Sequence, residues 1–117
     1  MTDSSNLDRQ LGMLPATFAA LLDEGLVVDA PLTVEFFFFA TERASAESLH
    51  VALGPTVTAV AVDEVRQGLF KKRVVAWSVT GSATVVASET ALKRWITDMV
   101  ILGERHQSEF DGWGASV

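Results

Sequence analysis

The chain has 117 residues, 49% hydrophobic and 21% charged, which indicates a single globular domain. Fifteen acidic residues against nine basic ones give a net charge of −6, so the surface should repel a phosphate backbone, and the absence of cysteine excludes disulfides, thiolate catalysis and cysteine-ligated zinc. No apolar run approaches the ~20 residues of a membrane span, and the start lacks signal-peptide features, so we expect a cytoplasmic protein without membrane contact.

The N-terminal segment predicts an amphipathic helix. Apolar residues recur there at helical spacing, but Pro15 interrupts the series. Because proline is tolerated in a first turn, we expect the firm helix to begin near Pro15 and to end at Gly25. We accordingly expect residues 1–13 to be flexible or partly helical, and residues 14–117 to form the domain.

Residues 32–40, with four consecutive phenylalanines, predict a strand that the other elements pack against. In an extended chain Phe36 and Phe38 share one face, and Phe37 and Phe39 share the other. Both faces are therefore apolar, which favours an interior position in a sheet because such an edge strand would aggregate. The sequence leaves open which pair faces the covering helices.

The middle of the chain predicts a helix, two strands and a long connection. The helix spans residues 41–54, and a strand at 56–62 follows it. Residues 63–72 are expected to connect that strand to the next, which spans 73–80 and carries Trp77. The segment after it is ambiguous, since it could extend the strand or cross over to the next element.

The C-terminal part predicts a well-determined helix and a short last strand. Ser88 is a good N-cap, and apolar residues follow at helical spacing to about His106. The tail then contains Asp111, Gly112 and Trp113, a composition that predicts a tight turn. Trp113 either plugs the end of the core or forms part of a partner-binding surface.

The predicted order, after the first helix, is strand, helix, strand, strand, helix, strand. This βαββαβ order is typical of the ferredoxin-like arrangement, an α+β fold with an antiparallel sheet and two helices on one face. The extra N-terminal helix could cover part of the other face or contact a partner.

Candidate catalytic and metal-binding groups are sparse. His106 lies near acidic residues without matching any metal motif, and His50 is better explained as a surface or interhelical residue. We therefore expect no catalytic residues, metal or cofactor. The basic residues 71–73, with Phe37, Phe39 and Trp77 on a sheet, also allow an RNA-binding alternative, although the third strand lacks the glycine and paired aromatics of the RNA-recognition signature.

The aromatic strand and the tail together resemble the regulator of ribonuclease E activity B family. The resemblance rests on Val34 and Glu35 leading into the phenylalanines, on Trp77, and on the terminal Phe-Asp-Gly-Trp-Gly of residues 110–114. This chain departs from the family in having Phe110 where tyrosine is common. The resemblance implies a ferredoxin-like, non-enzymatic protein that binds ribonuclease E on its non-catalytic scaffold half and restrains its cleavage of RNA.

The expected partner is therefore a protein, ribonuclease E or a related ribonuclease, and not nucleic acid. The alternative is a self-associating structural or adaptor module, such as a homodimer. The candidate binding residues come from the first strand, the third strand and the tail: Phe37, Phe39, Trp77, Asp111, Gly112 and Trp113.

Overall fold

The computed structural model describes residues 4–54, 60–67 and 74–117. The elements, in chain order, are α1 (Ser4–Asp23), β1 (Pro31–Ala40), α2 (Arg43–Leu53), β2 (Val60–Gln67), β3 (Val74–Val86), α3 (Glu89–Arg105) and β4 (Ser108–Ala115). The start of the predicted strand at 56–62 and the basic residues 71–73 lie outside the described residues. In the part of the chain described, no helix is long and apolar enough to cross a membrane.

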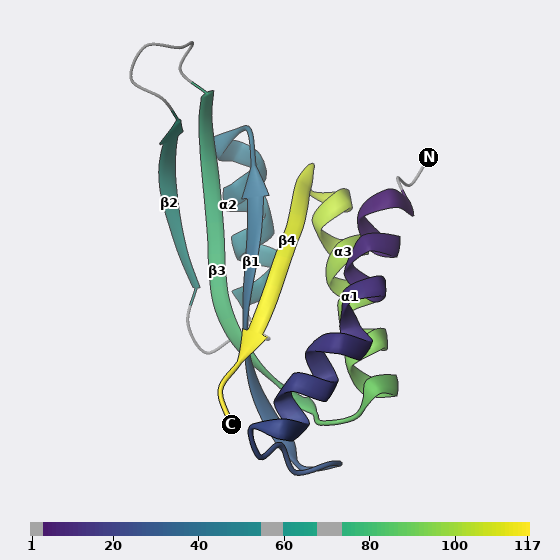
Figure 1. The fold of residues 1–117 in the computed structure, drawn as a ribbon. Helices are drawn as coiled ribbons and strands as arrows, with labels where there is room; N and C mark the ends of the chain where they lie inside the picture. The colour runs from purple at the N-terminus through teal and green to yellow at the C-terminus, as the bar shows by residue number, and fades with distance from the viewer. Residues whose placement is uncertain (1–3, 55–59, 68–73) are drawn as a thin grey trace.

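The strands form one antiparallel sheet in the order β2-β3-β1-β4 (Figure 1). β1 lies between β3 and β4, as expected for a strand with two apolar faces. The predicted α+β class and antiparallel sheet are therefore confirmed.

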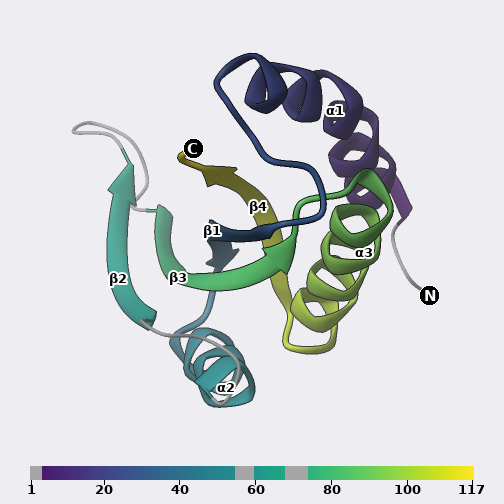
Figure 2. The ribbon, with the colours of Figure 1, turned by 90° about the horizontal axis from the view of Figure 1, so that it is seen from below.

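Side chains of β1 alternate between a buried face and an exposed face. Phe36 and Phe38 are completely buried, whereas Phe37 is 39% and Phe39 is 38% exposed. Helices α2 and α3 cover the face of Phe36 and Phe38 (Figure 2). Each fully buried phenylalanine stabilises the fold by roughly 1.5 to 3 kcal/mol, so this strand anchors the core and leaves its other face open.

Helix α3 forms as its sequence predicts. The Ser88 hydroxyl accepts a hydrogen bond from the amide of Ala91 at 3.0 Å, which caps the first turn. The buried positions repeat at helical spacing along the face that meets the sheet, and they are Leu92, Ile96, Met99, Val100 and Gly103.

Helix α1 begins well before the predicted start. It runs from Ser4 through Pro15, which removes only one backbone donor from the helix. The helix continues because Leu7 and Leu11 pack against the same core as the later turns. As a whole, α1 lies on α3 and beside β4 (Figures 1 and 2). It therefore covers neither face of the sheet, and the division of the chain at residue 14 stays a prediction.

Two strands extend beyond their predicted ends. β3 continues through Gly81 to Val86, which resolves the ambiguous segment as strand. β2 includes residues 63–67, which were expected to form a connection. Asp63 and Glu64 lower the strand propensity of this segment, but it is an edge strand, where charged residues are common, and pairing with β3 outweighs the local preference.

Candidate functional site

The open face of the sheet carries two partly exposed aromatic rings. Phe37 and Phe39 alternate along β1 with the buried Phe36 and Phe38 and therefore project from the opposite face. Figures 1 and 2 show α2 and α3 on the other side of the sheet. On β3 the antiparallel partners of Phe37 and Phe39 are Thr80 and Ser78, which place hydroxyl groups beside the rings. We call this surface, with Thr33 and Glu35, the open face. Rings surrounded by polar groups are typical of interaction surfaces.

A bulge in β4 determines how the tail is oriented. Phe38 pairs with Phe110 and Phe37 pairs with Gly112, so Asp111 is an extra residue between two pairs. Without it, Phe110 and Trp113 would point to opposite faces, because their spacing of three is odd. With it, both rings face the helices and make edge-to-face contacts with Trp95 of α3, at 5.9 and 6.1 Å between centroids.

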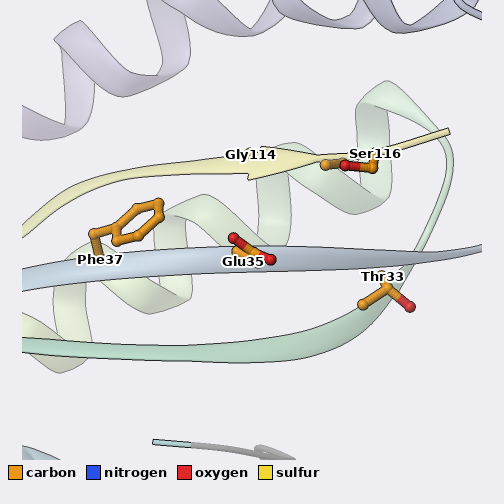
Figure 3. Close-up of a pocket in the computed structure, with 6 residues that line it drawn as sticks. Thr33, Glu35, Phe37, Gly114 and Ser116 are labelled. Carbon is orange, nitrogen blue, oxygen red and sulfur yellow. The ribbon is translucent and has the colours of Figure 1, made fainter. Parts of the chain in front are cut away.

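The same bulge leaves the open face bare along β4. Gly112 lies opposite Phe37 and Gly114 opposite Glu35, so no side chain covers these two residues from that strand. The result is a hollow of about 340 Å³, lined by Thr33, Glu35, Phe37, Gly114, Ala115 and Ser116. Figure 3 shows Phe37, Glu35 and Thr33 in one row along β1, with Gly114 and Ser116 beside them.

Helix α1 binds the outer edge of β4 at the bulge. The buried amide of Gln10 donates to the carbonyl oxygens of Phe110 and Asp111 at 3.4 and 3.2 Å, and Asn6 donates to the Phe110 carbonyl at 3.0 Å. Arg9 pairs with Glu109 at 3.2 Å on the surface. Carbonyls that a free edge strand would offer to another chain are thus already bonded.

The structure divides the predicted binding residues between two faces. Phe37, Phe39 and Gly112 share the open face, and Asp111 is exposed at the bulge. Trp77 pairs with buried Ala40 and therefore lies on the helix side, with the Arg43 guanidinium carbon 5.7 Å from its ring centroid.

Trp113 also lies on the helix side, half-buried against the core, and the predicted tight turn is instead a bulged strand. A turn and a bulge both use aspartate and glycine, which explains the error. The hollow beside Glu35 was missed in the sequence because it depends on the register of β1 with β4.

Within the described residues, no group of three or more histidine and acidic side chains is placed to hold a metal ion. His106 Nδ1 lies 2.6 Å from the Ser48 hydroxyl, a contact that joins the end of α3 to α2. His50 is exposed on α2. Neither ring lies on the open face.

Comparison with known proteins gives one family. The family model described as Regulator of ribonuclease activity B matches residues 15–115, which is nearly the whole chain. A search of curated proteins returns no match. The resemblance in the aromatic strand and the tail is thereby confirmed, and the chain belongs to the Regulator of ribonuclease activity B family.

Proposed function

We propose that this chain is a non-enzymatic, protein-binding regulator that docks on ribonuclease E and restrains its cleavage of RNA. Family membership supports the regulation of a ribonuclease. The observation that supports docking through the open face is that its two rings, Phe37 and Phe39, are partly exposed. Such a target places its action in the cytoplasm, on RNA turnover.

We also assign the domain to the ferredoxin-like arrangement. The order of β1, α2, β2, β3, α3 and β4 and the sheet order β2-β3-β1-β4 support this assignment, with α1 as an addition at the β4 edge. In this arrangement the helices bury one face of the sheet and the other is available to a partner. The fold thus supports a docking role without itself identifying the partner.

The net charge of −6 supports a basic contact region on the ribonuclease. RNA-binding segments of such an enzyme are basic, and an acidic protein would approach them faster than a neutral one would. Direct RNA binding has less support, because Trp77 lies on the opposite face from Phe37 and Phe39 and the three rings cannot stack bases together.

The experiment measures binding to the purified scaffold half of ribonuclease E and inhibition of RNA cleavage by the full enzyme. We expect a complex that weakens as salt increases, and slower cleavage in its presence. Replacing both Phe37 and Phe39 by serine should abolish both effects. Val51→Ser is the matched control, because Val51 is an exposed apolar residue on α2, away from the open face.

Two results would contradict the proposal. One is the absence of any salt-sensitive complex with the ribonuclease. The other is a tight dimer in light scattering that the double replacement of Phe37 and Phe39 dissociates, since a dimer burying both rings leaves no surface for a second protein and supports the self-associating alternative.

A further inference from the structure

We infer that the hollow beside Glu35 binds an arginine side chain of the protein partner. This inference rests on the proposed function and names the chemistry by which the open face would recognise its partner. Three features of the hollow support it: a carboxylate that pairs with no cation in the part of the chain described, an aromatic ring next to it, and the space left by glycine.

The carboxylate of Glu35 pairs with no cation within the described residues. Glu109 is paired with Arg9, and Glu47 is paired with Arg43 at 2.8 Å. Glu35 is exposed in the middle of the open face, among uncharged neighbours on β1 and β3. An incoming cation would therefore supply a partner that the described chain itself does not.

The ring of Phe37 lies next to this carboxylate along β1. Residues two apart on a strand point to one face, and at ~3.3 Å per residue their Cα atoms are about 7 Å apart. A cation placed between them could contact the Phe37 ring and the Glu35 carboxylate together (Figure 3). Cations are attracted to the faces of aromatic rings within about 6 Å of the centroid.

Arginine fits this pair of groups better than lysine. Its guanidinium is planar, so it can stack on a ring and donate two parallel hydrogen bonds to a carboxylate. It carries five N–H donors, and Thr33 and Ser116, whose hydroxyls can accept hydrogen bonds, also line the hollow. Lysine offers a point charge without the planar contact.

The glycines of β4 make the space for such a side chain. A cross-strand residue at 112 or 114 would normally cover Phe37 or Glu35, but both positions are glycine. The hollow of about 340 Å³ is therefore open to an incoming side chain beside Phe37 and Glu35.

The test uses the full chain labelled with nitrogen-15 and a blocked Gly-Gly-Arg-Gly-Gly peptide, with lysine and glutamine versions as comparisons. In NMR titrations, the arginine peptide should shift amides of residues 33–37 and 112–116 and bind several-fold more tightly than the lysine peptide. The glutamine peptide should cause no localised shift. Glu35→Gln should weaken binding by about tenfold, whereas Glu47→Gln, on α2, should not.

The inference is overturned if Glu35→Gln leaves the arginine peptide's affinity unchanged, if lysine binds as tightly as arginine, or if the shifts spread over the surface. The scaffold half of ribonuclease E separates this inference from the proposed function. If the unaltered chain binds the scaffold half and Glu35→Gln does not weaken that complex, the arginine site is overturned and the proposed function is not. If the chain binds the arginine peptide at Glu35 but does not bind the ribonuclease, the arginine site is supported and the proposed target is contradicted.

Discussion

Gly103 is a residue at which α3 lies in close contact with the sheet. A Cβ at this position would lie 2.9 Å from Cε1 of Phe38 and 3.0 Å from the carbonyl oxygen of Ser108. The backbone oxygen cannot move without displacing the start of β4, and the ring of Phe38 is fully buried. The glycine thus sets the distance between helix and sheet beneath the open face.

Gly103→Ala should destabilise the fold by about 1 to 3 kcal/mol, as overpacking does in closely packed cores. Urea unfolding monitored by tryptophan fluorescence measures the change in the free energy of unfolding. Gly12→Ala is the control, because nothing lies within 4 Å of a Cβ there and alanine should stabilise helix α1 by about 0.5 to 1 kcal/mol. Equal effects of the two substitutions would contradict the close approach at Gly103.

Individual residues also show which features of the site the sequence predicts. Phe37 and Phe39 were correctly placed on one face of the strand, because alternation along a strand follows from backbone geometry. Which pair would be buried could not be predicted, since both faces of β1 are apolar. Trp77 and Trp113 were assigned to the site by residue type, whereas their faces depend on register and on the bulge at Asp111.

At the scale of the elements, helix α1 protects the β4 edge through Gln10. Its amide is buried and donates to two carbonyls at the bulge, and within the described residues its Oε1 has no hydrogen-bond partner. The hydrogen bonds from Gln10 to the β4 carbonyls therefore form only while α1 lies against that strand. Losing them would leave the carbonyls of Phe110 and Asp111 without these donors.

Gln10→Ala should cost about 1 to 3 kcal/mol, because the Asp111 carbonyl loses its Gln10 donor and the Phe110 carbonyl keeps only the bond from Asn6. Hydrogen exchange followed by mass spectrometry should show faster exchange in α1 and β4, while β1 and β3 stay protected. Arg9→Ala is the control. It breaks an exposed ion pair and an exposed hydrogen bond to Asn6 Oδ1, and should cost less than about 1 kcal/mol. Unchanged exchange in α1 after Gln10→Ala would contradict the role of this contact.

Elements differ in how well the sequence predicts them. α3 was predicted almost to its ends, because a serine cap and a long apolar repeat agree. α1 was predicted too short, since Pro15 outweighed the apolar residues before it. The extent of β2 was not predicted, because the pairing that holds Asp63 and Glu64 in a strand involves the distant residues of β3.

For the molecule as a whole, we propose that a ribonuclease docks on the open face. The sheet order and the two covering helices indicate which face is available. The sheet order and the positions of these helices follow from the order of elements that the sequence predicts. The lack of side chains covering the open face beside β4 arises instead from the bulge and from Gly112 and Gly114. The family match supports the class of target, and the open face supports the mode of contact.

The chain has no cysteine, so a single introduced thiol reports on one position. Thr80→Cys places a thiol opposite Phe37 on the open face, and Val51→Cys places one on exposed α2. The most direct measurement is the rate of thiol alkylation with and without a saturating amount of the ribonuclease E scaffold half. We predict that the ribonuclease slows alkylation several-fold at position 80 and leaves position 51 unchanged. An unchanged rate at position 80 in a chain that forms the complex would contradict docking on the open face.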